Sequence, residues 1–297
     1  MGALKTRSGF VALAGRPNVG KSTLVNAMVG RKVAIVSDKP QTTRRAIRGV
    51  ATRDDVQIVL TDLPGVQRPR DELTRRMQHR VEQELGEADA ALFVVNGDQG
   101  VGGGGDQWIA EALRGTKVPI VIAVNKVDRT NNTRTVEALA AADALGLDAE
   151  VFPVSARTGR GVPALVDHLV GLLPEGPFYF PPDEFSDQPE HVMLAELVRE
   201  QVLLRTRQEV PHAVEVQVEE IEERENVVAV QAIMWVETES QKGILIGHQG
   251  RMIKAIGVAA RKEIERELAE RVHLDLSVRV RRSWRADDAL LDRLGIT

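Results

Sequence analysis

At 297 residues the chain is longer than one typical domain, so two domains are expected. It has no cysteine, which excludes disulfides and thiolate metal sites and favours a reducing cytoplasm. No apolar run reaches transmembrane length, and residues 1–5 lack the apolar core of a secretory signal. The net charge of −4 does not indicate a nucleic-acid binder, so such a role needs a local patch.

The first motif, which we call the phosphate loop, spans residues 15–22 and fits G-x-x-x-x-G-K-[ST]. It consists of Gly15, Arg16, Pro17, Asn18, Val19, Gly20, Lys21 and Ser22, with Thr23 next. The apolar run 10–14 before it predicts a buried strand, and residues 23–29 predict a helix. In this layout backbone N–H groups surround phosphate oxygens, Lys21 reaches the β- and γ-phosphates, and the Ser22 hydroxyl ligates Mg²⁺. The alternative is a glycine-rich turn with a chance Lys-Ser, which the flanking strand and helix argue against.

A polar, basic segment over residues 39–45 follows the first helix. A threonine hydroxyl in this segment can bind Mg²⁺ only while a γ-phosphate holds the segment in place, which would make it an order–disorder switch. Spacing leaves Thr42 and Thr43 open as the ligand, and we prefer Thr43. An ordinary exposed loop is the alternative.

The next predicted strand, 56–61, ends in Asp62-Leu63-Pro64-Gly65. An Asp at this place holds Mg²⁺ through water, and the Gly65 N–H meets a γ-phosphate. Val66 stands where many GTPases have a water-orienting glutamine, so we expect slow intrinsic hydrolysis. Asn18 is the candidate ligand of a monovalent cation such as K⁺, which would replace part of an arginine finger. The expected catalytic set is Lys21, Thr43, Gly65 and Asn18.

Two further strand ends complete the predicted nucleotide site. The apolar run 118–124 delivers Asn125-Lys126-Val127-Asp128, and the run 151–154 leads into Ser155-Ala156-Arg157. The Asp128 carboxylate can accept both N1–H and N2–H₂ of guanine, whereas adenine offers no matching pair. A backbone N–H of the second motif is expected to meet guanine O6. Each motif alone is also compatible with a polar loop, but their order predicts a GTP/GDP site.

The second half begins after a linker at 174–190, rich in Pro, Gly and acidic residues. We therefore expect a first domain over 1–173 and a second over 191–297. The pattern predicts a helix over 191–206, strands over 214–219 and 227–236, two helices, and a final strand over 272–280. The charged run 219–225 is interpreted as a solvated hairpin tip. In the first half, Gly102–Gly105 predicts an unusually flexible loop after the strand 91–95.

The turn Gly247-His248-Gln249-Gly250 joins the two predicted helices and suggests an RNA-binding KH module. Its glycines let the backbone approach a nucleic-acid backbone, and the following helix N-terminus favours phosphate. Lys242, Arg251, Lys254 and Arg261 are candidates to line the groove. A plain helix–helix turn is the alternative. Trp235 and Trp284 are expected to be packing residues.

Together these motifs resemble the bacterial Era GTPase family over essentially the whole chain. The resemblance implies an α/β fold, with a P-loop, Ras-like, doubly wound and mostly parallel sheet followed by a smaller α+β type II KH domain. It also implies GTP hydrolysis, binding of the 3′ end of small-subunit (16S) ribosomal RNA, and assistance to small ribosomal subunit assembly. Peripheral association with the inner face of the cell membrane is implied by the family alone. Leu63 stands where the family usually has Thr. We expect a cytoplasmic monomer.

Overall fold

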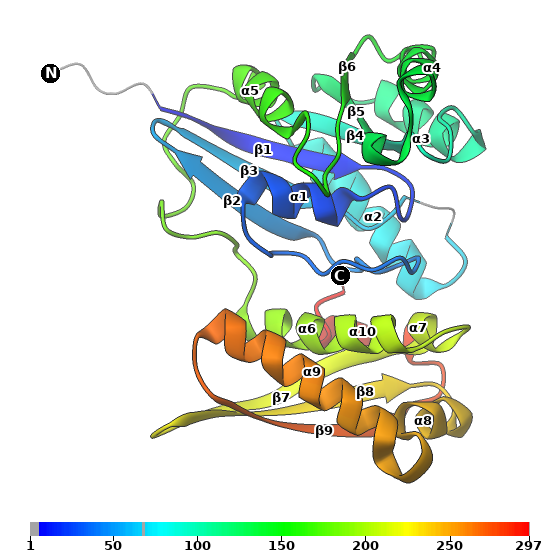
Figure 1. Cartoon of the computed structure of the whole chain (residues 1–297), viewed down its shortest axis with the longest axis vertical. Coiled ribbons are helices and arrows are strands. Elements are labelled where there is room, and N and C mark those ends of the chain that lie inside the picture. The colour runs from blue at the N-terminus through cyan, green and yellow to red at the C-terminus, as the bar shows by residue number, and fades with distance from the viewer. Residues whose placement is uncertain (1–5, 67–68, 297) are drawn as a thin grey trace, which may run out of the picture. The chain divides into compact units, whose positions relative to one another are not determined.

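The computed structural model describes residues 6–66 and 69–296, which divide into two compact units. The first unit holds most of the chain up to Asp187. The second begins at Gln188 and also includes two short segments from the first half, Ile35–Thr42 and Asp71–Leu73. Each unit is described by itself below (Figure 1).

The first unit is built on a six-stranded sheet in the order β2-β3-β1-β4-β5-β6. All neighbouring strands in it are parallel except β2 and β3, which pair antiparallel. Its strands are β1 (Arg7–Ala14), β2 (Ile47–Arg53), β3 (Val56–Asp62), β4 (Ala90–Asn96), β5 (Ile120–Asn125) and β6 (Glu150–Pro153). The strands β4 and β5 are apolar up to the asparagine that ends each of them, because helices cover both faces of the sheet.

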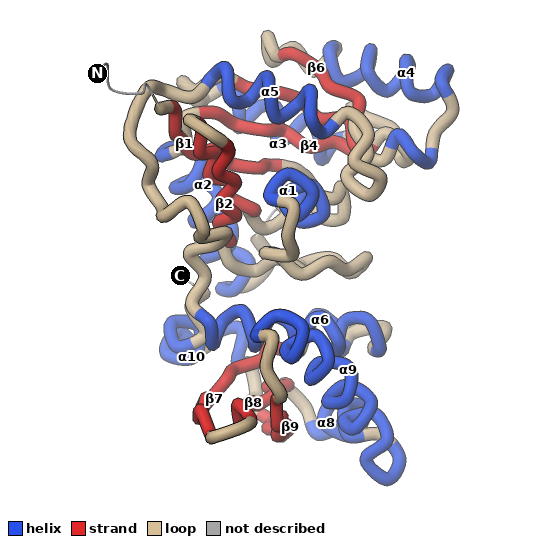
Figure 2. The backbone as a smooth tube through the Cα atoms, turned by 60° about the vertical axis from the view of Figure 1, so that its left-hand side comes forward, coloured by secondary structure: helices blue, strands red, loops and turns tan. Residues whose placement is uncertain are grey.

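Two helices cover one face of this sheet and three cover the other (Figure 2). The first face is packed by α1 (Lys21–Val29) and α5 (Val162–Leu172). The second is packed by α2 (Glu72–Glu87), α3 (Gly104–Arg114) and α4 (Asn132–Asp143). Because the strands are parallel, the carboxyl ends of β1, β3, β5 and β6 meet at one edge, where α/β sheets bind their ligands.

The predicted strands and the first helix are confirmed, but two sequence features in the first unit turn out differently. The edge strand β2 was not predicted, because its Arg48, Thr52 and Arg53 interrupt the apolar pattern. The prediction of a flexible loop over Gly102–Gly105 is wrong for its second half. Gly103 is the N-cap of α3, and Gly104 and Gly105 form its first turn. Here tertiary packing overrides the low helix propensity of glycine.

Residues of the predicted linker pack on the first unit. The Gln57 side chain accepts the N–H groups of Tyr179 and Phe180 at 2.8 and 2.9 Å and donates to the Phe180 carbonyl at 2.8 Å. A β-bridge joins Glu175 to Arg7. The main division between the units therefore falls after Asp187 rather than at the first prolines of the linker.

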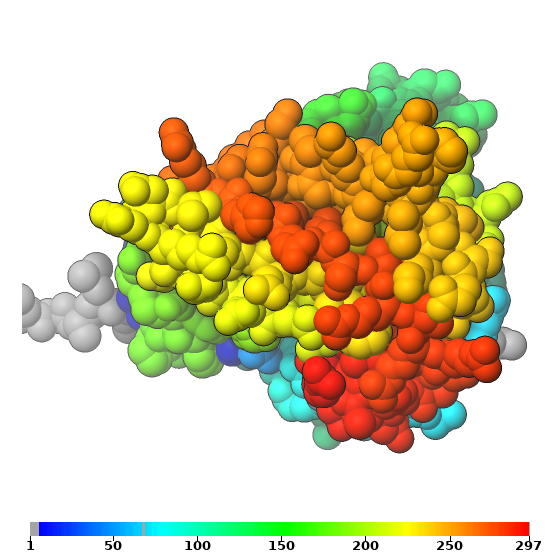
Figure 3. All heavy atoms as spheres, turned by 90° about the horizontal axis from the view of Figure 1, so that it is seen from below, coloured from blue at the N-terminus to red at the C-terminus, as the bar shows by residue number. Residues whose placement is uncertain are grey.

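The second unit holds a three-stranded sheet in the order β7-β8-β9, antiparallel between β7 and β8 and parallel between β8 and β9. Its elements are α6 (Glu190–Arg205), α7 (Val210–Ala213), β7 (Glu215–Arg224), β8 (Val227–Val236), α8 (Glu239–Ile246), α9 (Arg251–Leu268), β9 (Val272–Val280) and α10 (Asp288–Arg293). Apolar residues of α6, α8 and α9 pack on the sheet in one core. Figure 3 looks onto this unit, with the hairpin of β7 and β8 in yellow.

Most predicted elements of this half are confirmed, with one correction. The charged residues of the run 219–225 are exposed, as predicted, but only Glu225 lies in the hairpin turn, because β7 extends to Arg224 and pairs with β8. Its glutamates lie on an edge strand, where exposed charge is tolerated. Trp284 is fully buried and donates its indole N–H to the Ala213 carbonyl at 2.8 Å, as expected of a packing residue.

A buried ionic cluster lies in the core of the second unit. Arg199 on α6 has no exposed surface, and its Nε and Nη2 donate to the Glu196 carboxylate at 3.0 and 2.6 Å. The Glu215 carboxylate lies 3.7 Å from Nε. The guanidinium also donates to the Thr42 carbonyl, in the 35–42 segment of the same unit. The positive charge is thus compensated by two buried carboxylates and by a backbone oxygen.

Among residues 6–66 and 69–296, no helix combines the length and the apolar character needed to cross a lipid bilayer.

Candidate functional site

Three side-chain oxygens converge beside the phosphate loop. The Ser22 hydroxyl, on the first turn of α1, donates to Asp62 Oδ2 at 2.6 Å and lies 3.0 Å from the Thr43 hydroxyl. Thr43 in turn donates to the same Asp62 oxygen at 3.2 Å. Thr42 instead donates to the Lys39 carbonyl. The structure therefore brings Thr43, and not Thr42, to the two other expected metal ligands.

Lys21 is buried within the phosphate loop. Its ammonium donates to the carbonyls of Gly15 and Arg16 at 3.0 and 3.3 Å. Burial lowers its pKa to about 8, although the nearby Asp62 carboxylate raises it. A buried cation held only by backbone carbonyls and near one carboxylate is well placed to gain from a polyanionic ligand.

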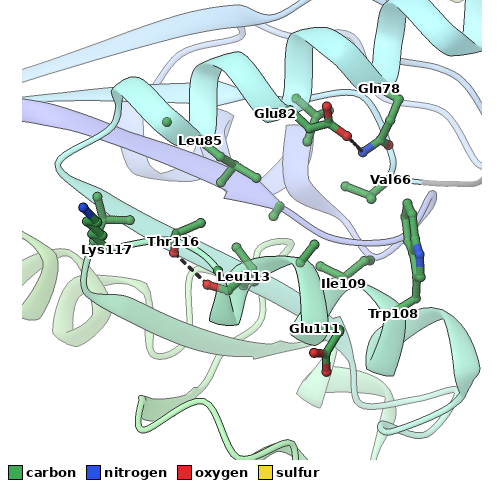
Figure 4. A pocket seen from close by; sticks show the side chains of 16 residues that line it. Val66, Gln78, Glu82, Leu85, Trp108, Ile109, Glu111, Leu113, Thr116 and Lys117 are labelled. Atoms are coloured by element: carbon green, nitrogen blue, oxygen red, sulfur yellow. Dashed lines mark hydrogen bonds between the residues drawn. The ribbon is translucent and has the colours of Figure 1, made fainter.

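Gly65 and Val66 connect the end of β3 to the phosphate loop. Gly65 lies directly against Pro17, since a β-carbon at Gly65 would be 2.7 Å from the Pro17 ring. The Val66 N–H donates to the Gly15 carbonyl at 3.1 Å. The Val66 side chain is turned away into the wall of a 620 Å³ cavity between α2 and α3, lined also by Leu85 and Ile109 (Figure 4). It therefore cannot orient a water molecule at the loop.

Asn125, at the end of β5, ties three segments together. Its Nδ2 donates to the Val19 carbonyl at 2.9 Å, and its Oδ1 accepts the N–H groups of Lys126 and Ala156 at 2.8 and 3.0 Å. The Ala156 N–H, a candidate donor to guanine O6, is thus engaged by Asn125 in this structure. Lys126 donates from its ammonium to the Asn18 carbonyl at 2.6 Å. The motif at 125–128 and the phosphate loop therefore form one connected framework.

Asp128 follows in a short 3₁₀ helix, Val127–Arg129. Its Oδ1 accepts the Ser155 hydroxyl at 2.6 Å, and its Oδ2 accepts Nη2 and Nε of Arg157 at 2.6 and 3.0 Å. The hydrogen bond from Ser155, together with Arg157, outweighs desolvation and lowers the pKa of Asp128. Asp128 therefore stays ionised near neutral pH, as an acceptor of two ligand N–H groups must.

The turn at 247–250 has the backbone geometry that its glycines allow. Gly247 has φ +70°, and a β-carbon there would lie 2.7 Å from that of Met252. Gly250 has φ +75° and precedes α9, while His248 and Gln249 are exposed at the tip. Of the basic candidates, Arg251 and Lys254 are exposed on α9, whereas Lys242 is half-buried on α8.

A shallow hollow of 330 Å³ lies between α9 and β9. Of the four basic candidates, Lys254 and Arg261 line this hollow, whereas Lys242 and Arg251 are not among its lining residues. The residues that the sequence argument missed are mostly apolar or small: Ile253, Gly257, Val258, His273, Leu274 and Leu276. Val258, on the α9 side of this hollow, is 43% exposed.

Family models match both halves of the chain. One, described as 50S ribosome-binding GTPase, matches residues 10–126, and the other, described as KH domain, matches residues 209–285. GTPase Era of Mycobacterium avium is 46% identical over 295 residues, which covers 97% of this chain and 98% of the relative. GTPase Era of Lactobacillus delbrueckii subsp. bulgaricus is 44% identical over 292 residues, or 98% of this chain and 96% of the relative.

Two solved structures are similar over nearly the full length. One is a crystal structure of Era in complex with MgGDPNP and nucleotides 1506–1542 of 16S ribosomal RNA, with a TM-score of 0.95, 33% identity, and coverage of 98% of this chain and 99% of that chain. The other is a single-residue variant of Aquifex aeolicus Era bound to GDP·AlF₄⁻, also with a TM-score of 0.95 and 33% identity, covering 98% of this chain and 100% of that chain. The similarity thus extends over both units rather than the first alone.

Proposed function

The chain belongs to the GTPase Era family, and we propose that it is a GTP-hydrolysing switch that binds 16S ribosomal RNA and assists assembly of the small ribosomal subunit. The observation that carries this proposal is the presence of two separate sites in one chain. The first unit presents the Ser22, Thr43 and Asp62 cluster beside the phosphate loop. The second presents the glycine turn at 247–250 next to a partly apolar hollow.

Residues that follow the carboxyl ends of β5 and β6 bind the guanine base. The ionised Asp128 carboxylate accepts two N–H groups of the base in place of Arg157, and Ser155 keeps it oriented. Asn125 holds the base motif against the phosphate loop, so base and phosphates are gripped by one framework. The backbone N–H groups of residues 15–22 and the α1 N-terminus bind the phosphates, and Lys21 lies between them.

The oxygen cluster fits Mg²⁺. Two hydroxyls and one carboxylate within hydrogen-bond distance of each other are hard oxygen donors, which this ion prefers with water and phosphate completing its shell. The described residues contain no group of three His, Cys, Asp or Glu that would favour another metal. Ser22 and Thr43 would bind Mg²⁺ directly and Asp62 through water. When bound, the ion neutralises charge on the phosphate oxygens during transfer to water.

Hydrolysis without a partner is expected to be slow. The apolar Val66 side chain lines the cavity between α2 and α3, so the attacking water lacks the side chain that orients it in many GTPases. Lys21 and the Gly65 N–H remain to stabilise the γ-phosphate charge. Asn18, within the loop, has a left-handed backbone (φ 64°), and we propose that its amide oxygen holds K⁺ near the phosphates. Equal turnover in Na⁺ and K⁺ buffers would exclude this role of Asn18.

RNA binding falls to the second unit. The turn at 247–250 brings backbone N–H groups to the RNA backbone, and the hollow between α9 and β9 accepts unstacked bases on its apolar floor. Lys254 and Arg261 at its margin contribute the positive charge that the whole chain lacks. We propose that the RNA is the single-stranded 3′ end of 16S ribosomal RNA.

The experiment combines turnover with RNA binding. GTP hydrolysis is measured with and without a 16S 3′-end oligonucleotide, and RNA affinity is measured with GTP and then GDP bound. Lys254→Ala should weaken RNA binding, whereas Lys262→Ala, on the same helix but outside the hollow, should not. No turnover in any condition would instead favour an RNA-binding module whose nucleotide site only senses GTP.

The cellular location and the oligomeric state of the chain can be tested separately. We propose a cytoplasmic monomer that contacts the inner face of the cell membrane peripherally, as the family resemblance implies. Fractionation of cells, with the chain followed in soluble and membrane pellets, tests the first point, and light scattering of the purified protein tests the second.

A further inference from the structure

Arg16, the second residue of the phosphate loop, forms an ion pair that the nucleotide motifs do not explain. Its Nε lies 2.6 Å from Oδ1 of Asp106, whose side chain is completely buried on the first turn of α3. The second carboxylate oxygen of Asp106 accepts the Gly102 N–H at 3.2 Å. Both oxygens are therefore engaged, and the negative charge is favourable at a helix N-terminus.

The path of the Arg16 side chain explains one glycine of the 102–105 run. A β-carbon at Gly105 would lie 2.6 Å from Cδ and 3.3 Å from Cγ of Arg16. At Gly104, one residue earlier in the same helix, a β-carbon would meet nothing within 4 Å. Gly105 therefore leaves the space through which Arg16 reaches Asp106.

The backbone of Arg16 lies within the machinery for phosphate transfer. Its carbonyl accepts the Lys21 ammonium at 3.3 Å, and the preceding carbonyl, of Gly15, accepts both Lys21 and the Val66 N–H. The next residue, Pro17, lies against Gly65. A shift of the Arg16 backbone would therefore move both Lys21 and Gly65, the two groups expected to contact the γ-phosphate.

From this geometry we infer that the Arg16–Asp106 ion pair is a positioning device, which anchors the phosphate loop to α3 and sets the place of Lys21 and Gly65 for hydrolysis. Neither side chain needs to touch the nucleotide. The inference rests on the GTPase activity proposed above. Ground-state binding is spread over base, phosphate and metal contacts, whereas the transition state depends on the placement of a few groups. Loss of the pair should therefore affect kcat more than KM.

The test is a double-mutant cycle with steady-state GTP hydrolysis as the readout. Arg16→Ala and Asp106→Asn should each lower kcat about tenfold and leave KM within about threefold, because a small misplacement of the loop is costly. The double variant should be no slower than the slower single variant, since both remove one interaction. Glu111→Gln, which removes an exposed ion pair of the same helix, is the control and should leave kcat unchanged.

The two glycines give a second test in which both charges are kept. Gly105→Ala should lower kcat like the loss of the pair, and Gly104→Ala should not, although both gain the same helix propensity. In an Arg16→Ala background, Gly105→Ala should have no further effect. Multiplicative losses in the cycle, unchanged kcat, or losses that follow the melting temperature would overturn the inference. Absence of turnover in the unsubstituted chain would refute the proposed activity instead.

Discussion

Asp128→Asn is the sharpest test of the base site. The carboxylate accepts two N–H groups of guanine, and each hydrogen bond to a charged group contributes about 1.5–3 kcal/mol. The side chain is 10% exposed, and the site is open to solvent where the base enters, so the lower figure applies to both. The amide removes the charge from the remaining hydrogen bond and turns its N–H₂ donor toward the N2 amino group of guanine, so GDP binding should weaken by about 3 kcal/mol, which is roughly 150-fold.

Xanthine carries a carbonyl where guanine carries the N2 amino group. The amide of the variant can accept N1–H and donate to that carbonyl, so xanthosine diphosphate should bind the variant about as tightly as GDP binds the natural chain. Competition against a fluorescent GDP analogue measures both affinities. Arg157→Ala is the matched control, because it removes the ion pair but keeps the acceptor. A variant that still prefers GDP by the original ratio would refute the role of Asp128.

Three further predictions concern charge and backbone geometry. Because burial lowers the pKa of Lys21 to about 8 and bound phosphates raise it, GDP affinity should fall about fourfold between pH 7 and 8.5 in titration calorimetry, and Lys21→Met should remove this dependence. Gly247→Ala should weaken RNA binding about tenfold in an anisotropy assay, since φ is +70°, whereas Gly243→Ala on the preceding helix should not; equal losses would contradict this. Arg199→Met should destabilise the second unit by about 3–5 kcal/mol in urea, because it removes the cation beside two buried carboxylates. The exposed Arg266→Met should cost under about 1 kcal/mol, and a similar cost for both would show that burial of Arg199 is unimportant.

The sequence predicted the first unit well because its strands are buried on both faces. Short, continuous apolar runs such as 120–124 are typical of strands in a parallel sheet, and each ends in a polar motif that the parallel topology then brings to one edge. The edge strand β2 lacks this pattern, since one side of it pairs with nothing in the sheet. The charged residues of β2 are typical of a loop, so the strand is recognised only from its pairing with β3.

Within the site, the residue types were predictable but their pairings were not. Spacing could not choose between Thr42 and Thr43, because both lie in a segment without a period, and only the fold shows which hydroxyl reaches Asp62. The Arg16–Asp106 pair joins residues that are 90 positions apart in sequence. The glycine run predicted a flexible loop because helix propensity depends on the local sequence alone. The space at Gly105 is instead filled by the Arg16 side chain, which is distant in sequence.

The short segment Ile35–Thr42 has a consequence for how this protein can be divided. It is bonded within the second unit by the Glu200 carboxylate, which accepts the Val36 N–H at 3.0 Å, and by Arg199 at the Thr42 carbonyl. A gene fragment that starts at Gln188 therefore encodes an incomplete module. In it, the buried Arg199 and Glu200 side chains lack the backbone groups of Thr42 and Val36 that they bind in the whole chain. No single cut in the chain separates two whole modules, so recombination that moved either half alone would have to replace this segment as well.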